Sequence, residues 1–198
     1  MIPTLERVRF SDVTHSNIRE THSRYGDGVL LTDFNDADAA TAASLVRVWA
    51  DVPRWVDAVV AGRRYADVDA LAAHAAHLAA GWTESDLDTA LAHHPRIGEK
   101  ASGTGAEARA SRGEQAAMTS ADRAVADRIA AGNAAYEQRF GRVFLIRAAG
   151  RSPEQMLAAL ERRLGAAPDD EWREAAGQLA EIAVLRLRDA VTDDSARG

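Results

Sequence analysis

The sequence contains no cysteine, one lysine (Lys100), five prolines, and aromatic residues at only 6%. Without cysteine the chain forms no disulfide, no cysteine-ligated zinc site and no thiol nucleophile. This absence suits a reducing compartment, and we expect a cytoplasmic protein. Because proline and glycine are scarce and local while alanine is abundant, most of the chain is compatible with helices.

A surplus of positive charge and a long apolar run are also missing. The chain has 24 basic and 30 acidic residues and a net charge of −6, and no basic patch is visible, so we expect no nucleic-acid binding. No stretch of about 18 apolar residues occurs, so we expect no membrane span. The first ten residues carry charges where a signal peptide has its apolar stretch. The composition, 46% hydrophobic and 27% charged, is typical of a soluble globular protein.

Apolar residues recur at helical spacing from Phe34 onward, between polar start signals and glycine stop signals. We expect helix starts at these polar residues: Asn35 or Asp36, Asp67, Thr83, the stretch 119–122, Ser152 and Pro168. Matching stops are expected at Gly62, Gly81, Gly141 and Gly165. The inward face of the last helix comprises Trp172, Leu179, Ile182, Ala183 and Leu187. These patterns predict an all-α protein, a single irregular bundle of about seven to eight helices.

The domain organisation follows from the same patterns. Residues 1–30 show no sustained period and are interpreted as an N-terminal extension. Residues 31–193 form the helical domain, and residues 194–198 a frayed tail. Residues 95–113 contain four glycines and few large apolar groups, which predicts a long loop of the kind that often carries function.

His94 stands where a helix is expected to end and this loop to begin. A helix C-terminus stabilises an imidazolium, and Pro95 biases His94 away from helical geometry. From the spacing alone, His94 is either a solvated residue at the helix end or a side chain that projects into a site. His74 and His77 lie three apart on a helix and could share a metal, but no third ligand stands near, so ordinary polar positions are favoured.

Two further patterns have both structural and functional interpretations. Ser111 and Glu114 have the spacing of a helix capping box. A hydrolase formed by these residues and His94 is disfavoured, because the chain lacks a Gly-x-Ser-x-Gly elbow. Residues 143–146 form an apolar run too short for a helix, which we expect to be extended. Asn133 falls on the otherwise apolar face of a helix, where a buried amide must find partners.

Three blocks of residues occur in one order along the chain. They are His94-Pro95-Arg96-Ile97-Gly98-Glu99-Lys100, then Ser111-x-x-Glu114-Gln115, then Asn133-x-x-Tyr136-x-x-x-Phe140-Gly141-x-x-Phe144. Together they resemble the OHCU decarboxylase family, the 2-oxo-4-hydroxy-4-carboxy-5-ureidoimidazoline decarboxylases of urate breakdown. Phe34-Asn35, Pro53-Arg54-Trp55 and Ile182-x-x-x-Arg186-Leu187 add to the resemblance, which covers about residues 31–191.

The resemblance implies a helical lyase without cofactor or metal, commonly a homodimer, that converts OHCU to (S)-allantoin and carbon dioxide. It assigns catalysis to His94 and Glu114. It assigns substrate binding to Pro95, Ser111, Arg186 and the backbone amides of Phe144, Leu145 and Ile146. Arg188 and Arg147 are nearby alternatives to Arg186.

A different class remains compatible with the composition. A small acidic helical protein could be a ligand-binding module of a regulator, without catalysis. The missing basic helix-turn-helix argues against a complete regulator.

Overall fold

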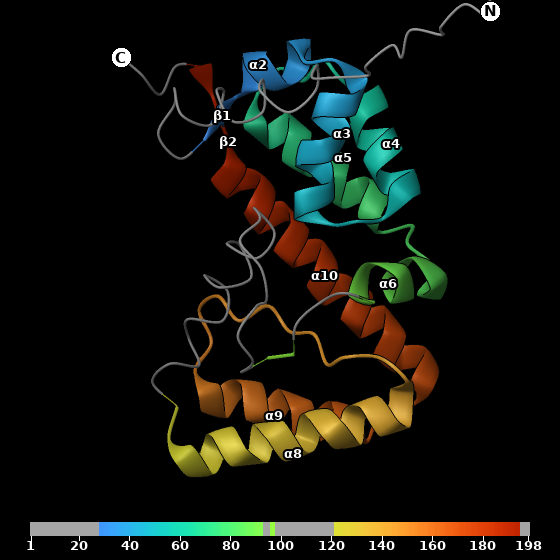
Figure 1. Ribbon diagram of the computed structural model, residues 1–198, viewed down its shortest axis with the longest axis vertical. Helices are drawn as coiled ribbons and strands as arrows, with labels where there is room; N and C mark the ends of the chain where they lie inside the picture. Colours follow the sequence, from blue (N-terminus) through green and yellow to red (C-terminus); the bar gives the residue numbers. More distant parts are fainter. Residues whose placement is uncertain (1–27, 93–95, 98–120, 195–198) are drawn as a thin grey trace, which may run out of the picture.

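The computed structural model describes residues 28–92, 96–97 and 121–194 (Figure 1). In these ranges the chain forms eight α-helices and one pair of two-residue parallel strands. The expected all-α class and helix number are therefore confirmed. Among the helices in these ranges, none is both long and apolar enough to cross a membrane.

Five helices form the N-terminal part of the bundle. They are α2 (Leu31–Asp36), α3 (Ala39–Trp49), α4 (Pro53–Ala61), α5 (Val68–Ala79) and α6 (Glu84–Leu91). Asp67 caps α5 by accepting a hydrogen bond from the Ala70 amide, and Thr83 and Asp86 form a capping box at α6. These starts lie where the sequence placed them, because a cap depends only on residues within one turn.

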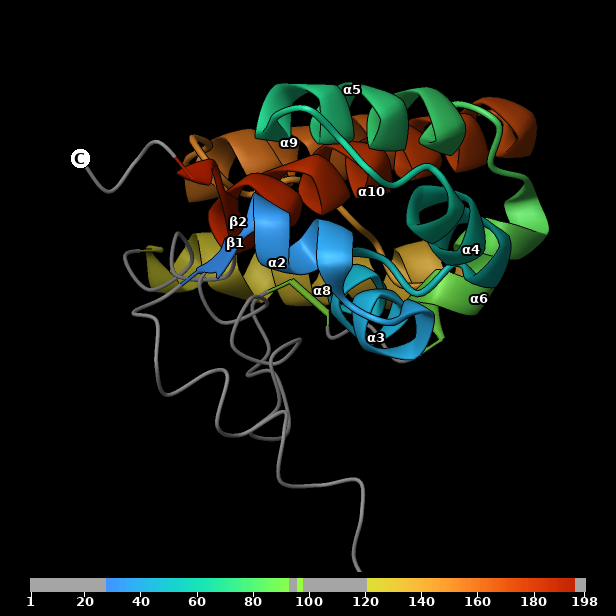
Figure 2. The ribbon, with the colours of Figure 1, turned by 90° about the horizontal axis from the view of Figure 1, so that it is seen from above.

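The remaining helices are α8 (Arg123–Phe140), α9 (Pro153–Leu164) and α10 (Pro168–Ala190). Gly141 ends α8 with φ of 71°, a conformation that favours glycine, and Ser152 and Gln155 form a capping box at α9. The long α10 runs from the pair α8–α9 to the N-terminal helices (Figure 1). Viewed from above, α5 runs beside α10, which it contacts (Figure 2).

The expected start of the first helix is wrong. Neither Asn35 nor Asp36 is a cap: both belong to the short α2, and Asp38 caps α3 through the amides of Ala40 and Thr41. Asn35 instead exchanges two hydrogen bonds of 2.9 Å with the backbone of Tyr65. Asn35, Asp36 and Asp38 are all residue types that cap helices, and local sequence alone does not distinguish among them.

Strand β1 (Val29–Leu30) pairs in parallel with β2 (Val191–Thr192), with Val29 opposite Val191. This pairing joins the two ends of the described chain, close to α2 (Figure 1). The amide of Val68 adds a hydrogen bond of 2.9 Å to the Asp193 carboxylate. The C-terminal end of α10 is thereby attached to the start of α5.

The buried apolar side chains form two clusters. The larger core lies among α2–α6 and α10 and includes Val46, Trp49, Trp55, Leu71 and Leu87. The smaller core is built on α8 and α9 and consists of Ile97, Ile129, Tyr136, Phe144, Ile146, Ala148, Met156, Leu157 and Leu160. On α10 the expected inward residues are buried except Trp172, which is half-buried, while its neighbour Glu171 is buried.

Candidate active site

Residues 143–148 follow α8 without helix or strand, which confirms that the run 143–146 is not helical. Phe144, Leu145 and Ile146 are all buried. The side chains of Phe144 and Ile146 belong to the smaller core, whereas that of Leu145 belongs to the larger core. Such alternation is typical of extended backbone. The segment therefore runs between the two cores.

The backbone amides of this segment are notable for their lack of partners. Among the described residues, no group accepts a hydrogen bond from the N–H of Phe144, Leu145 or Ile146. More than nine in ten buried backbone N–H groups in proteins are paired. Within the described ranges, three consecutive backbone donors at the junction of the two cores thus have no acceptor.

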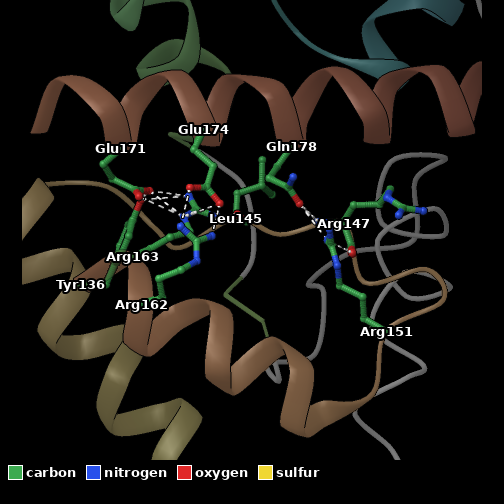
Figure 3. Close-up of polar contacts among 9 residues, drawn as sticks. All are labelled: Tyr136, Leu145, Arg147, Arg151, Arg162, Arg163, Glu171, Glu174 and Gln178. Carbon is green, nitrogen blue, oxygen red and sulfur yellow. Dashed lines mark hydrogen bonds and ion pairs between the residues drawn. The ribbon is translucent and has the colours of Figure 1, made fainter. Parts of the chain in front are cut away.

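A buried ion pair lies against the segment (Figure 3). The side chains of Arg163 on α9 and Glu171 on α10 are each 1% exposed, and Arg163 Nε lies 3.0 Å from both carboxylate oxygens of Glu171. Arg163 Nη1 donates to the Leu145 carbonyl at 2.8 Å, and the guanidinium carbon lies 4.6 Å from the centre of the Phe144 ring. One guanidinium thus binds a carboxylate, a backbone carbonyl and an aromatic face together.

Tyr136 of α8 completes this network. Its hydroxyl donates a hydrogen bond to Glu171, and burial, with that carboxylate beside it, raises the pKa of the phenol. Burial disfavours a charged Arg163, but its hydrogen bonds and ion pair with Glu171 outweigh this, so its pKa is raised. Arg163 therefore remains charged although it is buried.

The sequence analysis missed this network. Neither Arg163 nor Glu171 was singled out there as a candidate residue. One signal was present: Arg163 lies three residues after Leu160, on the apolar stripe of its helix. An arginine on a buried stripe needs a buried acceptor.

The far end of the segment is attached to α10 through Gln178 (Figure 3). Gln178 Oε1 accepts from the Arg147 amide at 3.0 Å and from Arg151 Nη1 at 2.8 Å, and Arg151 also donates to the Arg147 carbonyl. The Arg147 side chain forms an ion pair of 2.7 Å with Glu181. Arg147, an alternative to Arg186 as a substrate ligand, therefore has a carboxylate partner already.

The chain immediately after His94 and Pro95 is anchored on α8. Asn133 Nδ2 donates to the Ile97 carbonyl at 3.0 Å, and Arg96 forms a bidentate pair with Glu137, including a contact of 2.8 Å from Nη2 to Oε2. The hydrogen bond from Arg96 holds the pKa of Glu137 below its usual value. Ile97 packs in the smaller core with Phe144 and Ile146. Asn133, expected from the sequence to be a buried amide that needs a partner, finds one in the Ile97 carbonyl.

His94, Pro95, Ser111 and Glu114 lie outside the described residues. Of the other expected site residues, the structure brings Phe144 and Ile146 together with Ile97, the third residue after His94, while the side chain of Leu145 lies in the larger core.

Arg186 is buried, 7% exposed, and its Nη1 donates to the carbonyls of Val48 at 3.1 Å and Trp49 at 3.5 Å, at the end of α3. It lies two helical turns, ~12 Å, beyond Gln178 along α10. Arg188 is exposed and pairs with Asp69 at 2.6 Å, as expected for a surface residue. Of Arg186 and Arg188, only Arg186 is buried.

Within the ranges the structure covers, no group of three or more histidine, aspartate or glutamate residues is arranged to hold a metal ion. His74 lies against Tyr65, with ring centres 5.7 Å apart, and His77 is exposed. These two positions have the surroundings of ordinary helix residues.

Comparisons with known proteins agree on one family. The family model described as OHCU decarboxylase matches residues 35–188. A 2-oxo-4-hydroxy-4-carboxy-5-ureidoimidazoline decarboxylase of Amia calva is 37% identical over 100 residues, which are 50% of this chain and 57% of that protein. The chain thus matches little more than half the length of this curated relative.

Two solved structures share the fold. One is an OHCU decarboxylase crystallised in the presence of (S)-allantoin, with a TM-score of 0.60 and 22% identity, covering 71% of this chain and 92% of the other. The second is an (S)-allantoin synthase, with a TM-score of 0.59 and 20% identity, covering 82% of this chain and 54% of the other. At these identities the likeness concerns the arrangement of helices.

Proposed function

The chain belongs to the OHCU decarboxylase family, and we propose that it converts OHCU to (S)-allantoin and carbon dioxide in urate breakdown. The observation that carries this proposal is the match of the family over residues 35–188. The amides of residues 144–146, which have no acceptor among the described residues and lie near Ile97, support it.

The chemistry needs a protein that positions groups rather than one that supplies an electron sink. When the carboxylate leaves as carbon dioxide, the bonding electron pair passes into the C=N group of the substrate ring. The protein then has to orient the carboxylate, move protons and stabilise charge on the intermediate. Neither a metal nor an organic cofactor is required for these tasks.

His94 is the proposed proton-transfer residue, because an imidazole titrates near neutral pH and can take the 4-hydroxyl proton or return one to the ring. Glu114 is proposed to orient that imidazole and raise its basicity. Ser111 and Pro95 are proposed to line the substrate site. The contacts of Arg96 and Ile97 with α8 support this assignment, because they fix the position of the chain directly after His94 and Pro95.

The amides of Phe144, Leu145 and Ile146 are proposed to bind the ureido or ring carbonyls of the substrate. Free backbone donors are scarce in a helical protein, since helices consume their own amides. Arg186 is proposed as a further substrate ligand, because it is buried and directed inward. The alternative role for Arg186 is to bind the last carbonyls of α3, which its Nη1 contacts.

The cellular compartment and the oligomeric state also belong to the proposal. We place the protein in the cytoplasm, because a chain without cysteine needs no oxidising compartment. We propose a homodimer, as is common in the family. Sedimentation or light scattering of the full chain measures this directly, and a monomer at working concentration would contradict it.

The test is a coupled assay in which urate oxidase and hydroxyisourate hydrolase generate OHCU in the cuvette. The protein should accelerate the decay of the OHCU absorbance and make the allantoin optically active. A regulator module would bind without accelerating the decay. Racemic allantoin formed at the uncatalysed rate would refute the proposal.

The His94→Ala variant separates the chemistry from the fold. We expect turnover to fall by roughly two to four orders of magnitude, the usual cost of a lost acid–base group, with unchanged helical circular dichroism.

Exhaustive chelation with EDTA should leave the wild-type rate unchanged. Loss of activity with EDTA that zinc restores would return His74 and His77 to consideration as ligands.

A further inference from the structure

We propose that Arg163, Glu171 and Gln178 are positioning residues that hold residues 144–147 so that Ile146 presents its backbone to a ureide ligand. This inference rests on the proposed function, because it assumes that the amides of this segment bind substrate. None of the three side chains is proposed to touch the reacting atoms. Their role is to fix the direction of the peptide groups that do bind.

Peptide geometry gives the direction. The peptide between Leu145 and Ile146 is trans, so its C=O and N–H point in opposite directions. Because the Leu145 carbonyl is directed at Arg163, the Ile146 N–H points away from that guanidinium.

The next peptide shows the same relation. The Arg147 N–H is directed at Gln178, so the Ile146 carbonyl points away from α10. Ile146 therefore presents a donor and an acceptor together, on the side that Arg163 and Gln178 do not occupy. An extended residue with this arrangement can pair with an amide-like edge, as at the edge of a β-sheet. Ureido groups carry such an edge, with N–H and C=O side by side.

Stability alone does not require an arginine and a glutamate at positions 163 and 171. Apolar residues of similar volume often replace a buried pair with no loss of stability. A guanidinium, however, offers five donors in a fixed plane, and here they reach Glu171 and the Leu145 carbonyl at once. Glu171 orients the plane, and Tyr136 fixes the carboxylate. A lysine at this position could not serve both partners with the same geometry.

A neighbouring ion pair provides a matched control. Arg162 and Glu174 also join α9 to α10, with contacts of 3.0 Å and 2.5 Å, and Arg162 is largely exposed (Figure 3). Arg162→Met removes this ion pair between the same two helices, while Arg163 keeps Glu171, its contact of 3.8 Å with Glu174 and its hydrogen bond to the Leu145 carbonyl. A general effect of helix attachment would appear in this variant too.

The first experiment replaces the network with apolar residues of similar volume. The triple variant Tyr136→Phe/Arg163→Met/Glu171→Met leaves no charge in this network but removes the donor to the Leu145 carbonyl. We expect a folded protein by circular dichroism, with KM for OHCU and Kd for (S)-allantoin each raised at least about tenfold and kcat within about threefold of wild type. Such a KM effect with unchanged kcat indicates lost binding that is equal in the ground and transition states. Arg162→Met should match wild type.

The second experiment uses Gln178 and does not depend on the fold of the triple variant. Gln178→Leu removes the acceptor for the Arg147 amide and should raise KM and the (S)-allantoin Kd about fivefold or more. Gln178→Glu keeps an oxygen that both Arg147 and Arg151 can reach, and should restore both values to within about twofold of wild type.

The outcomes separate this inference from the proposed function. If wild type decarboxylates OHCU while the folded triple variant and Gln178→Leu keep wild-type KM and allantoin affinity, the positioning role is overturned and the function stands. If Gln178→Glu is as impaired as Gln178→Leu, the anchoring role of Gln178 is overturned. A wild-type chain that neither decarboxylates OHCU nor binds (S)-allantoin overturns both.

Discussion

The two cores of this protein are built in different ways. The larger core is packed by apolar and aromatic side chains, and the indole of Trp55 finds its acceptor in the Ala75 carbonyl at 2.9 Å. The smaller core is bordered by polar groups that cross from one element to another. Among the described residues, four polar or charged side chains are buried: Asn133, Arg163, Glu171 and Arg186. The first three lie beside the smaller core and Arg186 beside the larger.

This difference shows where the orientation of side chains and backbone groups is fixed in the molecule. Apolar packing stabilises a fold but tolerates many combinations of side chains of suitable volume. Hydrogen bonds and ion pairs have fixed geometry, and a buried one fails if its partner moves. The segment of residues 144–147 lies between the cores, and its polar attachments come from Arg163 of α9, from Gln178 of α10 and from Arg151, just before α9. The candidate site is therefore placed where the structure controls orientation most closely.

The largest expected effect comes from breaking one side of the buried pair. Arg163→Met leaves Glu171 buried without its guanidinium, which should lower the free energy of unfolding by about 3–5 kcal/mol in a urea titration. The triple apolar variant should instead lie close to wild type. If Arg163→Met costs less than about 1 kcal/mol, water reaches Glu171 and the contrast between the cores is smaller than the structure indicates.

A truncation in the larger core tests the other side of the comparison. Leu71 is fully buried, and Leu71→Ala should lower the free energy of unfolding by about 3 kcal/mol through lost burial and a cavity. Below its melting temperature, however, the KM for OHCU should be unchanged. A rise in KM equal to that of the triple variant would show that the larger core also sets the geometry of the segment.

Arg186 lies beside the larger core and is the proposed substrate ligand from that part of the protein. If its guanidinium binds the substrate through two nitrogens, Arg186→Lys should lower kcat/KM at least about tenfold, because lysine lacks the planar pair of donors. A tenfold loss corresponds to ~1.4 kcal/mol of transition-state binding free energy. Arg188→Lys, at the surface pair with Asp69, should change kcat/KM by less than about twofold. A loss of stability with unchanged kcat/KM in Arg186→Lys would assign this arginine to the end of α3 alone.

The smallest effect concerns the anchor of Arg96. Glu137→Gln removes the charge of an exposed pair and should cost less than about 1 kcal/mol of stability. Because Arg96 lowers the pKa of Glu137, this contribution is present above the ordinary value of 4.5 and is lost as the pH falls through the lowered one. The difference in unfolding free energy between wild type and Glu137→Gln should therefore shrink between about pH 5 and pH 3. A difference that grows toward acid pH would contradict the assigned direction.

Much of the fold could be predicted from local patterns. Asp67, Thr83 and Ser152 are caps where the sequence placed them, Gly141 ends its helix in a left-handed conformation, and residues 143–146 are not helical. Each of these features depends on residues within one or two turns. The order of the motif blocks also indicated the family that the comparisons show.

Only the tertiary structure decided which polar residues meet. Asn35 is bound by the backbone of Tyr65, Arg163 of α9 meets Glu171 of α10, and the partner of Asn133 is the carbonyl of Ile97. Helical periodicity tells which residues face inward, but not where one helix crosses another. The pairing of buried polar groups depends on that crossing, because a hydrogen bond needs its partner within about 3 Å and in a fixed direction. The amphipathic patterns therefore determined the helices, and their packing determined the polar attachments of residues 144–147.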